Sequence, residues 1–173
     1  MKSQILSLFV AMGTILTMAS SAAVPTAEKL MEEAKQKATS EEKNVFLMFS
    51  TTGCAWCKVL KSFIESDEIK PIFTKHFVPV VLMLGNDANT NPGATVYEQK
   101  YGPAQGVPYH AFITPKGEEI VDSKENGDGG NIGYPAAPNE IAWFMAMLKK
   151  AAPKMSSDER NVIETKLKSY KRG

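Results

Sequence analysis

Apolar runs of strand length alternate along this chain with segments in which apolar residues recur every three or four positions. The runs are residues 45–49, 77–84 and 109–114, and their length predicts strands. The first run is almost wholly apolar, which favours a central strand buried on both faces. Residues 118–122 follow the turn-forming sequence Pro115-Lys116-Gly117, and they predict a fourth strand antiparallel to the third.

Helical spacing of apolar residues predicts six helices around these strands. They cover residues 26–39, 55–66, 67–75, 94–101, 139–152 and 156–171. Asn139 is the predicted N-cap of the fifth helix. The inner stripe of this helix is expected to consist of four apolar side chains, namely Ile141, Phe144, Met145 and Leu148. Strands that alternate with helices predict an α/β fold in which helices pack on a central sheet.

Two longer segments between these elements have the composition of loops. Residues 85–93 are rich in glycine and asparagine, which predicts a loop. Residues 124–138 contain four glycines and two prolines, and a loop of this length is often functional. Asp128 and Asn131 do not follow the spacing of a calcium-binding loop. We therefore expect a surface loop here and no metal site.

The first 23 residues have the order of a secretory signal peptide. Lys2 precedes an uncharged apolar stretch at residues 5–18, and small residues follow at 19–23. Cleavage is expected after Ala22 or Ala23. An uncleaved anchor is the alternative, because the segment is just long enough to span a bilayer. Its small and polar residues favour cleavage, and the absence of cysteine excludes a lipid anchor on an N-terminal cysteine.

The composition is that of one globular domain, which would cover residues 24–173 after the signal peptide. The chain has 173 residues, 43% of them hydrophobic, with 20 basic and 19 acidic residues. Such a balance excludes a protein that binds nucleic acid through excess positive charge. Export would place the domain in the periplasm or outside the cell, where disulfides form and exchange.

The two cysteines of the chain stand between the first predicted strand and the helix that follows it. On a helix that begins at Cys54, Cys57 lies one turn further, so the sulfurs share a face and can close a disulfide or open to a dithiol. The helix N-terminus favours a thiolate at Cys54, and Lys58 and Lys61 add positive charge. We expect Cys54 to be the attacking nucleophile and Cys57, one turn deeper, the resolving thiol.

Other uses of the two cysteines fit less well. A structural disulfide that closes so short a loop contributes little stability. A zinc site needs about four ligands, and the two histidines, His76 and His110, are not at a finger-like spacing. Haem attachment fails because Lys58 occupies the required histidine position. We therefore expect redox chemistry on sulfur, with no metal and no other cofactor.

Two motifs resemble those of the thioredoxin-like family. They are Gly53-Cys54-Ala55-Trp56-Cys57-Lys58 and Gly106-Val107-Pro108, and the resemblance covers residues 27–152. It implies a thioredoxin-like fold with a central mixed sheet flanked by helices, to which residues 156–171 add a C-terminal helix. It also implies that Pro108 is cis and lies against the cysteine pair, so that the backbone of Val107 can pair with an extended substrate peptide.

The resemblance further implies roles for residues around the cysteines. Trp56, Val107, Pro108 and Tyr109 are the expected substrate-binding residues, and Gly53 and Lys58 support the cysteines. The sequence is most similar to secreted single-domain thioredoxin-like proteins and to the thioredoxin-like domain of bacterial transmembrane thiol reductases.

One departure from the family concerns proton transfer. Thioredoxins commonly carry a buried aspartate six residues before the first cysteine, where this chain has Met48. The resolving thiol would then lose its proton to water or to another group. No histidine stands between the cysteines, where Ala55 and Trp56 are found. This favours reduction of substrates as the direction of exchange.

These observations predict a thiol–disulfide oxidoreductase of the periplasm or cell exterior that reduces protein disulfides through Cys54 and Cys57. Its expected partners are a protein or small-molecule disulfide and a redox protein that supplies or accepts electrons. Nucleic acid is not an expected partner, and neither is a membrane once the signal peptide is removed. The alternatives are a disulfide oxidase or isomerase, and a non-catalytic peptide-binding module, which Met48 and the loop at 124–138 favour.

Overall fold

The computed structural model describes residues 23–103, 105–125 and 129–169. The predicted signal peptide, apart from Ala23, lies outside the described residues, as does the end of the last predicted helix. All of the predicted strands and most of the predicted helical segments fall within them.

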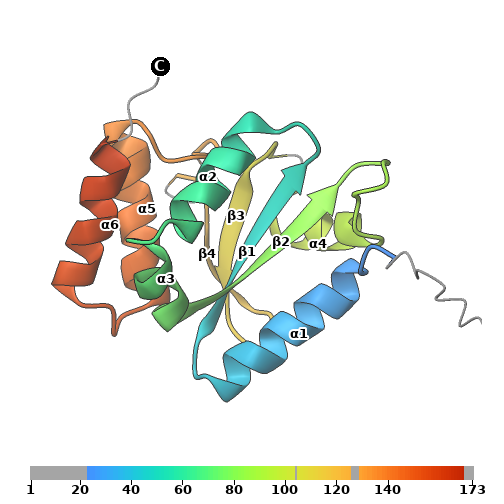
Figure 1. Ribbon diagram of the computed structural model, residues 1–173, viewed down its shortest axis with the longest axis horizontal. Coiled ribbons are helices and arrows are strands. Elements are labelled where there is room, and N and C mark those ends of the chain that lie inside the picture. Colours follow the sequence, from blue (N-terminus) through green and yellow to red (C-terminus); the bar gives the residue numbers. More distant parts are fainter. Residues whose placement is uncertain (1–22, 104, 126–128, 170–173) are drawn as a thin grey trace, which may run out of the picture.

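The central strand β1 (Asn44–Thr51) organises a mixed sheet of four strands in the order β2-β1-β3-β4 (Figure 1). It pairs in parallel with β2 (Phe77–Leu84) and antiparallel with β3 (Tyr109–Ile113). The last strand, β4 (Glu119–Asp122), pairs antiparallel with β3. The four predicted strands and the central position of the first are confirmed.

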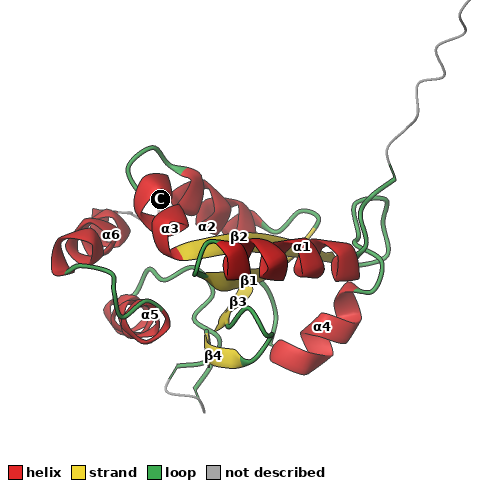
Figure 2. Cartoon of the chain, turned by 90° about the horizontal axis from the view of Figure 1, so that it is seen from below, coloured by secondary structure: helices red, strands yellow, loops and turns green. Residues whose placement is uncertain are grey.

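Helices cover both faces of the sheet, and α5 and α6 lie beside each other (Figure 2). The helices of the described chain are α1 (Ala27–Ser40), α2 (Ala55–Glu65), α3 (Lys70–His76), α4 (Ala94–Tyr101), α5 (Pro138–Ala151) and α6 (Ser157–Ser169). Side chains of α1 and α4 share one apolar cluster with the sheet, and those of α2, α3, α5 and α6 share the other. The chain therefore has a sheet between two helical layers, as predicted.

Alternation along β1 sends its side chains into both layers. Phe46 and Met48 enter the cluster under α2 and α5, whereas Leu47 and Phe49 enter the cluster under α1. All four are at most 2% exposed. Burying one such side chain contributes about 1.5–3 kcal/mol, so β1 is a rigid base for the segment that follows it.

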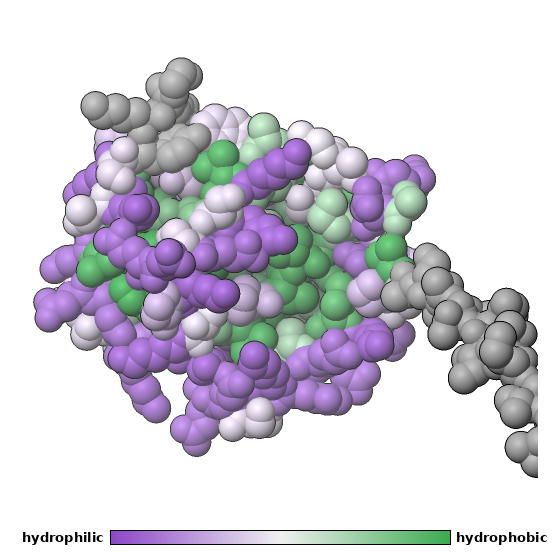
Figure 3. All heavy atoms as spheres, viewed as in Figure 1, coloured by the Kyte–Doolittle hydropathy of each residue, from purple (hydrophilic) through white to green (hydrophobic). Residues whose placement is uncertain are grey.

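The edge strand β2 reaches the surface between α1 and α2. Figure 3 shows apolar side chains gathered in the middle of this face, with hydrophilic residues around them. Pro79 lies exposed within β2, and proline cannot donate a backbone hydrogen bond to an added strand. The proline therefore limits pairing of this edge with another chain.

The start of α5 differs from the prediction. The helix begins at Pro138, and Ala137 rather than Asn139 is its N-cap residue. The Glu140 carboxylate accepts hydrogen bonds from the backbone nitrogens of Ala136 and Ala137, at 2.9 and 2.7 Å. A carboxylate at the third position, together with proline at the first, thus caps this helix without a polar N-cap side chain. Of the predicted inner stripe, Met145 is only partly buried, and Met147, which the prediction did not include, is buried in its place.

Candidate redox site

The turn from β1 into α2 places Cys54 at the N-terminus of the helix. The Cys54 backbone nitrogen donates to the Thr51 carbonyl at 3.2 Å. Gly53 has a φ of +84°, a left-handed conformation that glycine adopts without steric cost. Cys54 is the N-cap residue, and its sulfur accepts a hydrogen bond from the Cys57 backbone nitrogen at 3.1 Å. A donor of this kind stabilises a thiolate in the reduced protein.

Cys54 and Cys57 form a disulfide with an S–S distance of 2.05 Å. Cys57 is 2% exposed, whereas Cys54 is half-buried. An incoming molecule can therefore reach the first cysteine and not the second. This difference in access agrees with the roles expected of an attacking and a resolving thiol.

The peptide bond between Val107 and Pro108 is cis, as the resemblance implied. Val107, Pro108 and Trp56 line one groove of about 220 Å³. The remaining lining residues come from the two loops that flank the groove and are Gln105, Gly106, Asn131, Ile132, Gly133 and Tyr134. The structure thus brings together three of the four predicted substrate-binding residues.

The backbone of Val107 is available at this groove. Val107 is half-buried, and within the described parts of the chain neither its N–H nor its carbonyl oxygen has a hydrogen-bond partner. Free backbone groups of this kind can pair with an extended peptide as an added strand would.

The fourth predicted residue, Tyr109, does not line the groove, and its expected role in substrate binding is corrected. Its side chain is 1% exposed, and its hydroxyl donates to the Tyr101 carbonyl at 2.6 Å. Its ring packs against Phe49, with 6.2 Å between ring centroids. Burial raises the pKa of the phenol. The reason is strand alternation, which turns Tyr109 into the cluster under α1 and α4.

Tyr134 is the aromatic residue of the groove that sequence analysis missed. Its ring stacks on Trp56, with 5.9 Å between centroids and 17° between planes, and meets Phe63 edge-on at 6.1 Å. Tyr134 is 4% exposed and Ile132 6%. The loop at 124–138 is therefore only in part a surface loop, because its second half packs against the redox site. An aromatic residue within so polar a loop was the signal that could have indicated this contact.

A family model for a thioredoxin-like domain matches residues 31–124 of the chain. The match covers more than half of the sequence and includes both cysteines and Pro108. The chain belongs to the family of thioredoxin-like domains.

Three solved structures are similar to this thioredoxin-like protein, and the first of them supports the same fold. The disulphide isomerase from Xylella fastidiosa Temecula1 has a TM-score of 0.50 and 17% identity, covering 90% of this chain and 98% of that one. A DsbH oxidoreductase gives 0.42 and 21%, with 82% and 94% coverage. The oxidised C-terminal domain of Neisseria meningitidis DsbD gives 0.47 and 19%, with 73% and 99% coverage. No curated protein sequence matches the chain.

None of the helices in the described part of this thioredoxin-like protein is long and apolar enough to cross a membrane.

Met48 of β1 occupies the position where thioredoxins commonly carry a buried aspartate. It and its partner on β3 are both buried and uncharged. Met48 is 2% exposed and lies opposite His110 in the register. His110 is fully buried between the rings of Phe46 and Phe144, at centroid distances of 5.5 and 5.6 Å. Burial lowers the pKa of His110 to about 3, so the imidazole is neutral at neutral pH. This pair therefore adds no charge to the apolar cluster at this position.

The two lysines expected to add charge near the thiols differ in their surroundings. Lys61 lies 3.9 Å from the Glu65 carboxylate, which offsets its charge. Lys58 is exposed and lines a second groove of about 490 Å³, of which Tyr134 and Phe63 form part of the wall. The Lys58 backbone nitrogen donates to the Cys54 carbonyl at 3.3 Å, so Lys58 lies one turn from the first cysteine.

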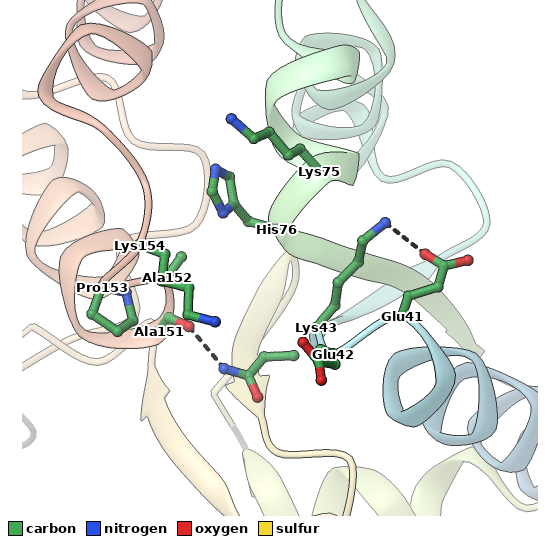
Figure 4. Close-up of a pocket in the computed structure, with 10 residues that line it drawn as sticks. Glu41, Glu42, Lys43, Lys75, His76, Ala151, Ala152, Pro153 and Lys154 are labelled. Carbon is green, nitrogen blue, oxygen red and sulfur yellow. Dashed lines mark hydrogen bonds and ion pairs between the residues drawn. The ribbon is translucent and has the colours of Figure 1, made fainter.

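A separate cavity of about 440 Å³ lies at the other end of β1 (Figure 4). The Asn44 side chain lines this cavity, and its amide nitrogen donates to the Ala151 carbonyl at 2.8 Å. Lys43 pairs with Glu41 at its rim, and the groups labelled in Figure 4 include no sulfur. The polar groups here join β1 to the end of α5, and we assign them a structural role.

Beside this cavity, Glu159 of α6 binds the end of α3. Its carboxylate accepts from Lys75 Nζ at 2.7 Å and from the Ser156 backbone nitrogen at 2.8 Å, and it lies 3.1 Å from His76 Nε2. The hydrogen bond from Lys75, followed by that from Ser156, lowers the pKa of Glu159 from 4.5 to about 2. The ionised carboxylate therefore stabilises the folded state.

We expect Glu159→Gln to lower the free energy of unfolding by about 1 kcal/mol at pH 7, since solvent screens this partly exposed pair. The folded-state pKa lies below the unfolded value, so the contribution is complete above pH 4.5 and is lost as the pH falls towards 2. Urea unfolding of both proteins at a series of pH values measures the difference.

The matched control is Glu164→Gln on the same helix, where Lys168, one turn away, is the one ion-pair partner of Glu164 among the residues that the structure describes. It should cost about 0.3–0.5 kcal/mol. A loss in Glu159→Gln that stays constant down to pH 2 would contradict the role of the carboxylate charge.

Proposed function

We propose that this protein is a thiol–disulfide oxidoreductase of the periplasm or cell exterior that reduces protein disulfides. The observation that carries the proposal is the position of the Cys54–Cys57 disulfide at the N-terminus of α2, with one sulfur accessible and the other buried. A purely structural disulfide with so short a loop would contribute little stability.

The exchange proceeds in two displacements on sulfur. The Cys54 thiolate attacks one sulfur of the substrate disulfide, which forms a mixed disulfide and releases the other substrate sulfur as a thiolate that takes up a proton. The Cys57 thiol then loses its proton and attacks the Cys54 sulfur, which releases the second substrate thiol and forms the Cys54–Cys57 disulfide. Two electrons pass from the protein to the substrate, and the step uses no metal or organic cofactor.

Three features around the cysteines support this sequence of steps. The N–H of Cys57 and the exposed ammonium of Lys58 favour the attacking thiolate. The free backbone of Val107 can hold an extended peptide beside the accessible sulfur. Trp56 and Pro108 add apolar walls to the groove. Together these features favour a disulfide within a polypeptide as the substrate.

Reduction is the direction that the sequence between the cysteines supports, because Ala55 and Trp56 cannot stabilise the thiolate as a histidine would. Location outside the cytoplasm is supported by the order of residues 1–23. A partner redox protein would return electrons to the oxidised pair. Isomerisation remains the alternative within the same chemistry, since a similar fold belongs to a disulphide isomerase.

The second candidate function is a peptide-binding module without turnover. The apolar Met48 and the neutral His110 favour it, because neither can take the proton of Cys57 as a carboxylate would. In that case the groove would hold a partner peptide while the disulfide stays closed.

The reduction potential of the Cys54–Cys57 pair distinguishes the two candidates. We expect a value between about −300 and −180 mV when the protein is equilibrated with defined ratios of reduced and oxidised dithiothreitol or glutathione. A potential far below about −300 mV, the range of inert structural disulfides, would refute the exchange function and support the binding module.

A further inference from the structure

We infer that Asn131 is a positioning residue of the redox site, which holds the Val107–Pro108 loop in the form that accepts a peptide backbone and so favours peptide disulfides over small ones. This inference rests on the proposed exchange function and names the substrate feature that the site selects. Asn131 lies in the loop at 124–138, for which the sequence predicted no contact with the cysteines.

The amide nitrogen of Asn131 faces the carbonyl oxygens of the loop that carries Pro108. It donates to the Pro108 oxygen at 3.0 Å and to the Gln105 oxygen at 3.2 Å, and it lies 3.5 Å from the Gly106 oxygen. The carbonyl of Val107 is the one that this side chain leaves unbonded. One amide therefore fixes the loop on both sides of Val107.

The amide oxygen of Asn131 is held from the other side. It accepts from the Ser123 hydroxyl at 2.8 Å and from the Gly133 backbone nitrogen at 3.1 Å. Ser123 is fully buried, and its hydroxyl also accepts from the His110 backbone nitrogen at 3.1 Å. Because two donors face the oxygen and carbonyl oxygens face the nitrogen, the amide has one favourable orientation.

The network connects the loop to the sheet. Ser123 follows β4, and its backbone nitrogen donates to the His110 carbonyl of β3 at 2.8 Å. The same loop then brings Tyr134 onto Trp56. Asn131 thus connects β3 and β4 to the backbone of the groove that Trp56 lines.

The effect of fixing this loop depends on whether the substrate has a peptide backbone. A polypeptide can pair its own backbone with the N–H and carbonyl of Val107, so it gains from a loop that is already in place. A small disulfide without peptide groups gains nothing from Val107 and needs only the thiolate. Loosening the loop should therefore weaken the binding of peptide disulfides and leave the chemistry on sulfur unchanged.

Asn131→Asp is the sharpest test because it changes one half of the amide. Carboxylate oxygens can still accept from Ser123 and Gly133, but they cannot donate to the Pro108 and Gln105 carbonyls. We expect the insulin concentration at half-saturation to rise about tenfold in single-turnover reactions of the pre-reduced protein, with the maximal rate within about twofold. The rate constant with neutral bis(2-hydroxyethyl) disulfide should stay within about twofold of that of the wild type.

The test compares the change in insulin reduction with the change in bis(2-hydroxyethyl) disulfide reduction as a ratio. An effect of the added charge on the reactivity of the thiols changes both reactions alike and cancels in this ratio. Asn161→Asp, the same change at an exposed position of α6, should leave both rates unchanged. If Asn131→Asp does not unfold cooperatively, Ser123→Ala takes its place, because it removes one of the two donors to the amide oxygen and keeps the amide nitrogen of Asn131. An unchanged ratio in the variant, or an equal loss on both substrates, overturns the inference. A wild-type protein that reduces neither substrate overturns the proposed function as well.

Discussion

Replacing Cys54 with serine is expected to abolish reduction of protein disulfides, whereas replacing Cys57 with serine should leave a protein that accumulates mixed disulfides. Serine at position 54 removes the accessible sulfur, and the buried Cys57 cannot reach a substrate in its place. We expect the turnover of Cys54→Ser to fall by at least about 10³-fold, as for the loss of a covalent nucleophile. With Cys57→Ser, the first displacement still occurs but the second cannot.

Insulin reduction followed by turbidity measures turnover, and non-reducing gels of protein incubated with insulin measure the mixed disulfide. The variant in which both cysteines are replaced is the control, and it should give neither signal. Full insulin-reducing activity in both single variants would show that the pair does not perform the chemistry. A mixed disulfide that forms in Cys54→Ser and not in Cys57→Ser would reverse the two roles.

Local patterns were sufficient to predict the elements that carry the site. The apolar run 77–84 has the bounds of β2, and the run around Phe49 is the central strand. Burial on both faces explains this success, because a strand between two helical layers has few polar positions. The cysteine pair and the cis bond before Pro108 followed from motifs that are contiguous in the sequence.

The parts that failed depend on contacts between distant residues. Tyr109 was expected at the groove because it follows Pro108, but the alternation of β3 turns it into the core. The groove position is filled instead by Tyr134, which lies 78 residues beyond Trp56 in the chain. The stacking of Tyr134 on Trp56 and the hydrogen bonds of Asn131 to the carbonyls of residues 105 and 108 correspond to no periodic pattern in the sequence. Polar loop residues of this kind resemble surface residues until the fold places them.

Tyr109 and Asn131 both hold the backbone around Pro108 in place. The Tyr109 side chain fixes the segment around Pro108 from the core, and the Asn131 amide fixes it from the loop at 124–138. Val107, which lies in this stretch, has backbone groups at the groove that no other described residue pairs with. The edge that we propose binds the substrate is thus held from two layers of the fold, and a change in either layer should disturb it.

The core side can be tested by Gly102→Ala, which we expect to lower the free energy of unfolding by about 3 kcal/mol. Gly102 follows α4 with a φ of −160°, which lies outside the left-handed region that favours glycine, so the expected cost comes from the clash with a neighbouring side chain. A Cβ atom at this position would lie 2.2 Å from Cε1 and 2.4 Å from Cδ1 of the Tyr109 ring. The Tyr109 ring cannot move away easily, because its hydroxyl donates a hydrogen bond to the Tyr101 carbonyl and Phe49 packs against the ring.

Urea unfolding measures this loss, and Gly130→Ala is the matched control. A Cβ atom on Gly130 would meet nothing within 4 Å, so its free energy of unfolding should change by no more than about 0.5 kcal/mol. In a background that carries Tyr109→Ala, the ring is absent and Gly102→Ala should cost little more than the control change. A double-mutant cycle between positions 102 and 109 gives this coupling directly. If Gly102→Ala lowers the free energy of unfolding equally with and without the Tyr109 ring, a clash with this ring is not the reason that glycine is needed at position 102.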